Sequence, residues 1–219
     1  MTGQEIIDKF HTYIDDQSEL STQEEIDLLN NIYQNVYRTR HWEWLKTVKA
    51  GTSFDGVDSV TGQAYITLPD DFLAFAENNN MTDNTYEVEN NASPKVVYII
   101  ANNTYQPYQI VNFSDRRKYF NKDGVAWHDS INKRLVFVQT PKASTQYEFD
   151  YIAKPAPLTL SNSPIFDPDL HQILVHGMAI DHEIISLFDR AHSYAQENRA
   201  AYKGYLDQLA WENAEQLLN

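Results

Sequence analysis

The chain has 219 residues, of which 42% are hydrophobic and 22% charged, and its formal net charge is −14. These values are typical of a globular protein with one large domain or two small ones. The sequence has no cysteine, which excludes disulfide scaffolds, thiol catalysis and thiolate metal sites. No apolar run approaches the roughly 18 residues that span a membrane, and the start "MTGQEIIDKF" lacks the pattern of a secretory signal.

The excess negative charge lies at the two ends of the chain. Residues 1–45 hold nine acidic and three basic residues, residues 161–219 hold the same numbers, and each end therefore carries −6. Residues 46–160 hold thirteen acidic and eleven basic residues, which gives −2. Such a surface repels nucleic acid, so sequence-specific DNA binding is not expected. The charge distribution leaves open the possibility of a surface past which DNA slides without being bound.

The first 45 residues predict two helices. Apolar residues recur at helical spacing from Ile6 to Ile14. The stretch "STQE", Ser21–Glu24, is a capping box, and it predicts the start of a second helix that runs to about Arg40. The two tryptophans of "HWEWL", His41–Leu45, are expected to anchor the core near the end of that helix.

The middle of the chain changes to the patterns of strands. "YEFDYI" (Tyr147–Ile152) predicts a half-exposed strand with its aromatic residues on one face. "KVVYIIA" (Lys95–Ala101) and "RLVFVQ" (Arg134–Gln139) predict central strands covered on both faces. "YQPYQIV" (Tyr105–Val111) is expected to pair with the first of these, and its Pro107 favours an edge position.

The last third of the chain returns to helix. Asp167 is a predicted N-cap, Pro168 occupies the first helical position, and Asp169 adds negative charge at the positive end of the helix dipole. Apolar residues follow at steps of three and four, and Gly177 among them allows another backbone to come close. A final helix is expected from about Arg190 to Leu218.

Together these elements predict an α+β chain with an inserted domain. A helical bundle is built from the N- and C-terminal helices, residues 1–45 and 161–219. A small antiparallel β barrel or sandwich, residues 46–160, is inserted between them. A parallel sheet is not expected, because no long helices alternate with the strands.

Two candidate catalytic patterns receive structural interpretations. Asp70 and Asp71 in "YITLPDDF" suit a turn, because short acidic side chains accept backbone hydrogen bonds there. A glycosidase-like acid pair would need two carboxyl groups facing one substrate, whereas adjacent residues point apart. The histidines lack the spacing of a helical metal motif and are interpreted as solvated or interface residues. No catalytic, cofactor or metal site is therefore predicted.

The candidate functional residues are contact residues. The stretch "SDRRKYF" predicts a short helix capped by Ser114 that carries the basic cluster. This cluster is a solvated face, a contact with an acidic neighbour such as the acidic helices of the next subunit, or a nucleic-acid contact. Asp181 falls near an apolar stripe and marks a capped core position or a subunit contact. The complete set of candidate interface residues is Arg116, Arg117, Lys118, Lys122, Asp181, Tyr202, Tyr205 and Trp211.

The order of these motifs resembles the head-to-tail adaptor, or connector, proteins of tailed bacteriophages. A helical pair ends in a tryptophan-bearing segment and is followed by "YITLPDDF". "RLVFVQTPKASTQYEFDYIAKPAPLTL" and "FDPDLHQILVHGMAIDHEI" come next. The similarity extends over nearly the whole chain, and the order and spacing of the motifs carry it.

The resemblance implies a virion structural protein without catalysis or cofactor. Its copies, commonly about twelve, would form a closed ring between the portal and the tail or nozzle proteins. DNA would pass through the lumen without sequence-specific binding. The protein would be assembled in the host cytoplasm, become part of the virion neck, and have no membrane partner. The polar residues 76–93 and the C-terminal helix would become ordered on docking.

Two alternatives stay open at this point. The many tyrosines of residues 46–160 are compatible with a non-catalytic β-domain that binds a glycan or a protein. The Asp70–Asp71 pair is compatible with an acid-pair hydrolase. The adaptor ranks above both, since it accounts for the whole chain.

Overall fold

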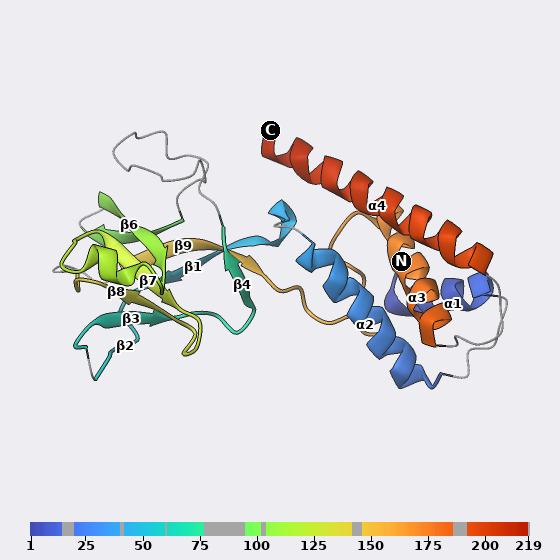
Figure 1. The fold of residues 1–219 in the computed structure, drawn as a ribbon, viewed down its shortest axis with the longest axis horizontal. Coiled ribbons are helices and arrows are strands. Elements are labelled where there is room, and N and C mark those ends of the chain that lie inside the picture. Colours follow the sequence, from blue (N-terminus) through green and yellow to red (C-terminus); the bar gives the residue numbers. More distant parts are fainter. Residues whose placement is uncertain are drawn as a thin grey trace. The chain divides into compact units, whose positions relative to one another are not determined.

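The structure, a computed structural model, describes residues 1–14, 20–39, 42–59, 61–76, 95–101, 104–141, 146–185 and 192–218 (Figure 1). Residues 183–185, 192–196 and 213–218 are described by their backbone alone. The chain divides into two units, Met1–Trp44 with Pro155–Asn219, and Leu45–Lys154. Of the polar segment 76–93 that was expected to become ordered on docking, residues 77–93 lie outside the described residues. His41 and Arg190 also lie outside them.

The first unit is helical. In the described residues its elements are α1 (Gly3–Ile14), α2 (Thr22–Arg38), η1 (Glu43–Leu45), η3 (Pro168–Leu170), α3 (Gln172–Ile185) and α4 (His192–Leu218). Helix α3 packs against α1, α2 and α4. Residues 173–179 are all buried, so α3 is covered on every side. A helix that is apolar all round is stable at the centre of a domain, which explains why α3 and not a terminal helix lies there.

The predicted helix starts are confirmed. At α2, the Ser21 hydroxyl accepts from the Glu24 backbone amide, and the Glu24 carboxylate accepts from the Ser21 amide at 2.8 Å. Asp167 also caps as predicted and accepts from the Asp169 amide at 2.8 Å. The helix that it caps is the short 3₁₀ helix η3, and α3 begins after it, at Gln172.

The segment 155–166 accepts hydrogen bonds from the first turn of α1. The amides of Gly3 and Gln4 donate to the carbonyl oxygens of Asn162, at 2.9 Å, and Leu160, at 3.0 Å. These amides have no partner inside the helix, so the segment supplies the acceptors that a helix start needs. Glycine is required at position 3, because a Cβ there would collide with the carbonyl oxygen of Thr159.

The second unit contains a sheet of nine strands in the described residues. They are β1 (Lys46–Gly51), β2 (Gly56–Val57), β3 (Ala64–Thr67), β4 (Phe72–Phe75), β5 (Val96–Ala101), β6 (Thr104–Asn112), β7 (Val125–Asp129), β8 (Arg134–Phe137) and β9 (Gln146–Ala153). Their order is β1-β9-β5-β6-β7-β8-β3-β2, and β4 pairs with β9 beside this path. The sheet curls into a half-barrel (Figure 1). The predicted small antiparallel β barrel or sandwich is therefore corrected to one open, curled sheet.

Two strand predictions are wrong. Strands β6 and β7 pair in parallel, with Gln109 opposite Val125, so the sheet is mixed and not fully antiparallel. Strand β6 also lies between β5 and β7, so Pro107 is not on an edge strand. The physical reason is the register: β7 pairs with β6 from Gln109 onward, and Pro107 precedes that stretch and is paired with Tyr98 of β5 alone. Its missing N–H is tolerated because one side of β6 is unpaired there.

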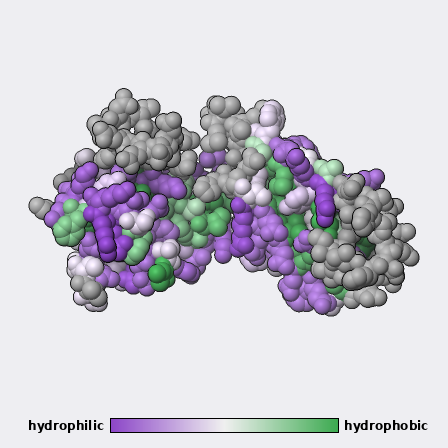
Figure 2. Space-filling view, viewed as in Figure 1, coloured by the Kyte–Doolittle hydropathy of each residue, from purple (hydrophilic) through white to green (hydrophobic). Residues whose placement is uncertain are grey.

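The core of the β unit is aromatic and follows the predicted alternation. Tyr147, Phe149 and Tyr151 of β9 are all buried on one face, as the sequence indicated. The expected central positions of β5 and β8 are confirmed, because each has a neighbour on both sides. Around this core, Figure 2 shows a largely hydrophilic surface with separate hydrophobic patches. The apolar surface of the strands is thus mainly turned inside the curl of the sheet.

Candidate interaction surface

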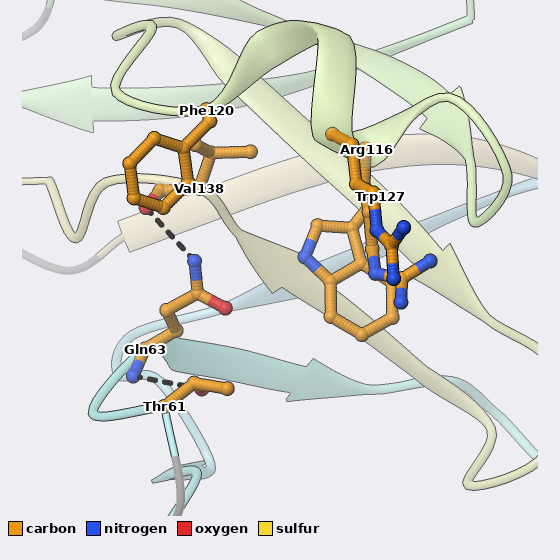
Figure 3. A pocket seen from close by; sticks show the side chains of 7 residues that line it. Thr61, Gln63, Arg116, Phe120, Trp127 and Val138 are labelled. Atoms are coloured by element: carbon orange, nitrogen blue, oxygen red, sulfur yellow. Dashed lines mark hydrogen bonds between the residues drawn. The ribbon is translucent and has the colours of Figure 1, made fainter.

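A pocket of about 360 Å³ lies on the β unit beside the predicted basic cluster. Arg116 belongs to the 3₁₀ helix η2 (Arg116–Tyr119), and Trp127 lies on β7. Figure 3 shows these two side chains facing Gln63 and Phe120 across the pocket. Its complete lining is Thr61, Gln63, Arg116, Arg117, Phe120, Trp127 and Val138. The pocket, referred to below as the Arg116 pocket, therefore joins positive charge to aromatic and aliphatic surface.

The guanidinium of Arg116 is fixed on an aromatic pair. Its Nη1 donates to the carbonyl oxygen of Phe113 at 2.6 Å. Its Cζ lies 3.4 Å from the ring centroid of Phe113 and 5.8 Å from that of Trp127. The two rings are themselves in edge contact, with centroids 5.2 Å apart. Cation–π attraction and the hydrogen bond together hold the charge in one place, which is what recognition of an anion requires.

The segment that carries the cluster is held at both ends. Asp115, and not the predicted Ser114, is the N-cap of η2, and its side chain makes no capping hydrogen bond. Its carboxylate lies 3.1 Å from the Lys118 ammonium instead. At the far end, the carbonyl oxygen of Asn121 accepts from the Gln139 side chain at 2.7 Å. The predicted short helix is confirmed as a 3₁₀ turn, and its cap is corrected.

The opposite wall presents an oriented amide. The Gln63 Nε2 donates to the carbonyl oxygen of Val138 at 3.0 Å, which leaves its Oε1 turned toward Trp127 (Figure 3). The Gln63 backbone amide donates to the Thr61 hydroxyl at 3.4 Å. Thr61 in turn donates to Asp58 at 3.1 Å. The wall is therefore organised by hydrogen bonds within the chain itself.

The basic cluster is only partly brought together. Arg116 and Arg117 line the pocket, whereas Lys118 is paired with Asp115 and Lys122 lies 5.3 Å above the ring centroid of Tyr119. Sequence reasoning missed Gln63, which precedes β3, Trp127 on β7, and Val138, which follows β8. The signal available in the sequence was the aromatic Phe120 beside the basic cluster, and in the structure its side chain is 80% exposed.

The candidate residues of the helical unit do not form one surface. Burial raises the pKa of Asp181, and both burial and the nearby Asp181 charge raise the pKa of Tyr202. The Tyr205 ring stacks on His176, with centroids 5.7 Å apart. These three residues are half-buried, whereas Trp211 is 61% exposed. Asp181, Tyr202 and Tyr205 thus lie at the packing of α3 and α4, and Trp211 faces outward.

The interpretation of the histidines as solvated or interface residues is wrong for two of them. His171 and His176 are buried, with 1% and 9% of their surfaces accessible. The His171 ring contacts the carbonyl oxygen of Phe166 at 2.9 Å and the N-terminal amine at 2.7 Å. The His176 Nδ1 lies 3.1 Å from the Asn198 Oδ1. An imidazole is tolerated in the core when its nitrogen atoms have partners. Both nitrogens of His171 have one, and so does the Nδ1 of His176.

We predict that Asp181→Asn raises the free energy of unfolding at pH 7. The pKa of Asp181 lies above its ordinary value of 3.8 because burial disfavours the carboxylate. The folded state therefore binds the proton more tightly than the unfolded state, and stability is lost as pH rises through the raised pKa. Urea unfolding should give a larger free energy of unfolding for the variant than for the original protein at pH 7. This difference should vanish as the pH falls below 3.8, the ordinary pKa.

The matched control is Asp207→Asn, because Asp207 is an exposed acid on α4. It should leave stability nearly unchanged. A loss of stability in Asp181→Asn at pH 7 would contradict the burial argument and would point to a partner that needs the charge.

The Asp70–Asp71 pair is a turn, as predicted. The Phe72 amide donates to the carbonyl oxygen of Pro69 at 3.0 Å. The Asp71 carboxylate accepts from the Tyr151 hydroxyl at 3.1 Å, and Asp70 is exposed. The contact with Tyr151 gives Asp71 a structural role. The tyrosines Tyr108, Tyr147 and Tyr151 are buried and do not present rings to a glycan.

Two kinds of site are absent from the part of the chain that the structure describes. Within these residues, no group of three or more histidine, aspartate or glutamate side chains is arranged to hold a metal ion. The helices so described include none that combines the length and the apolar character needed to cross a membrane.

The chain was compared with known proteins. No curated protein matches it. A family model described as SU10 adaptor protein matches residues 1–217, which is nearly the full length. The resemblance to phage head-to-tail adaptors that the motif order indicated is confirmed by this match. Because this match covers residues of both units, the chain belongs to the SU10 adaptor protein family.

Proposed function

We propose that the protein is the head-to-tail adaptor of a tailed-bacteriophage virion. Its copies, about twelve, form a ring between the portal and the tail or nozzle proteins, and DNA passes through the lumen. The observation that carries this proposal is the family match over residues 1–217, because it includes both units and not a single motif. The role is structural, without catalysis or cofactor, and assembly takes place in the host cytoplasm.

The charge of the helical unit supports a DNA channel. Exposed acids follow one another along the first two helices at Glu5, Asp8, Glu24 and Asp27. A lumen lined by carboxylates repels phosphates, so DNA slides without being held. We propose that the N- and C-terminal helices form a bundle, residues 1–45 and 161–219, that lines the lumen. The β domain, residues 46–160, then contacts neighbouring subunits.

The test is co-assembly with the portal. The full chain is mixed with the portal protein encoded by the same phage, and the mixture is examined by native mass spectrometry and electron microscopy. Ring-shaped complexes with a fixed number of adaptor copies are expected. The adaptor alone is measured in parallel, because the ring is expected to form on the portal. A chain that stays monomeric and does not bind the portal would contradict the proposal.

A further inference from the structure

Two features of opposite chemistry are exposed on the chain. One is the Arg116 pocket, which combines two guanidinium groups with aromatic and aliphatic walls. The other is a face of α4, residues 200–211, where exposed residues recur at steps of three and four. This α4 face consists of Ala200, Lys203, Gly204, Asp207, Gln208 and Trp211.

Trp211 is the protruding group of the α4 face. Its side chain is 61% exposed, more than any other large hydrophobic side chain in the described helices. Ala200 and Gly204 precede it on the same face, and a Cβ at Gly204 would meet nothing within 4 Å. The α4 face is therefore low about two to three turns before the indole, so another body can approach the helix there. Exposed tryptophans of this kind are frequent centres of protein interfaces.

Asp207 supplies the acid of the α4 face. It is exposed and lies four residues before Trp211, so both side chains project from the same side of the helix. Lys203 stands one further turn back and is also exposed. An acid beside an aromatic ring is the complement of the Arg116 pocket, where the exposed Arg117 stands beside Phe120 and Trp127.

The pocket has the dimensions and chemistry for an indole. Its volume is about 360 Å³, which lies within the range of sites for small organic groups. Trp127, Phe120 and Val138 offer apolar walls, and the Gln63 Oε1 is an acceptor that an indole N–H can reach (Figure 3). The fixed Arg116 guanidinium adds a cation that can stack on a ring.

We propose that the Arg116 pocket of one subunit binds the Trp211 side chain of a second copy of this chain, with Asp207 of that copy beside Arg117. This inference rests on the proposed ring and names the contact that links its subunits. Because the two patches differ, the contact is heterologous: every subunit offers one pocket and one tryptophan, and rotation by a constant angle closes a ring.

Cross-linking tests the proximity directly, because the chain has no native cysteine. Thr61→Cys on the pocket rim is combined with Gln208→Cys on the α4 face, and complexes with the portal are treated with a short bis-maleimide. The expected result is a ladder of adaptor dimers and larger multiples in a denaturing gel. The matched control replaces Thr61→Cys by Ile131→Cys, an 87% exposed position in the turn at the far end of the β7–β8 hairpin. It should give no ladder.

Charge reversal tests the chemistry of the contact. Arg117→Glu and Asp207→Lys should each lower the yield of rings at least about tenfold at fixed concentration, and the double variant should recover most of it. Trp211→Ala should lower the yield by at least about thirtyfold, as a central aromatic anchor does. Circular dichroism of each free subunit checks that the fold is kept.

The outcomes separate the two proposals. Rings that form normally with the portal, while the Thr61–Gln208 pair gives no ladder, overturn the pocket contact and leave the adaptor function intact. A cross-linked product that migrates with the mass of a single chain also overturns the pocket contact, because residues 61 and 208 would then meet within one subunit. If no ring forms with the portal at all, both proposals fail.

Discussion

Replacing Trp42 by alanine is expected to lower the free energy of unfolding by about 3–5 kcal/mol. The Trp42 side chain has 0% of its surface accessible, and its Nε1 donates to the carbonyl oxygen of Val36 at 3.0 Å. That carbonyl oxygen lies in the last turn of α2 and also accepts from the Thr39 amide at 3.3 Å and the Thr39 hydroxyl at 2.7 Å. The indole therefore fills the core and adds a third hydrogen bond at the helix end. Urea denaturation followed by far-UV circular dichroism measures the loss.

Two variants separate the contributions at this position. Trp42→Phe keeps an aromatic ring and loses the N–H, so it should cost less than the alanine variant. Trp44→Ala removes the half-buried ring that stacks on Trp42, with centroids 4.5 Å apart, and should also cost less. An equal loss for Trp44→Ala and Trp42→Ala would show that the stack, and not burial of Trp42, supplies the stability.

Replacing Asn30 by alanine is expected to cost about 2–4 kcal/mol. The Asn30 amide forms a two-sided clamp on the backbone of Leu158: its Nδ2 donates to the Leu158 carbonyl oxygen at 2.9 Å, and its Oδ1 accepts from the Leu158 amide at 2.7 Å. Leu158 is 2% exposed. Alanine would leave a backbone donor and acceptor without these partners in a part-buried site, and such groups are costly. Thermal and urea unfolding of the variant measure the effect.

The matched control is Asn31→Ala, because Asn31 is the next residue of the same helix and is exposed. It should change stability by less than about 0.5 kcal/mol. If both alanine variants were equally stable, the clamp would have no energetic role.

The sequence alone predicted the structure correctly where the hydrogen-bonding or packing partners lie close together in the sequence. The capping box at Ser21–Glu24 and the cap at Asp167 were predictable, since donor and acceptor lie within three residues. The buried face of β9 was predictable as well, because alternation along a strand is geometric. The turn at Asp70–Asp71 followed from its residue types.

Other features depend on which distant residues meet. Pro107 indicated a position where one side of its strand has no neighbour to accept a backbone hydrogen bond, and this holds at residue 107 itself. The strand is nevertheless interior, because its pairing with β7 begins two residues later, at Gln109. His171 and His176 have no sequence pattern that distinguishes a buried imidazole from a solvated one. Their burial depends on Phe166 and Asn198 as partners. The clamp of Asn30 on Leu158 joins positions 128 residues apart.

The sequence by itself determined the family, the α+β class, the acidic ends and the starts of helices, because each depends on residue type and short spacing. Tertiary structure alone decided the curl and mixed pairing of the sheet. It also decided the composition of the Arg116 pocket, whose lining comes from four separate stretches of the chain. A pocket is a property of packed surfaces, and no local pattern specifies which side chains converge on it.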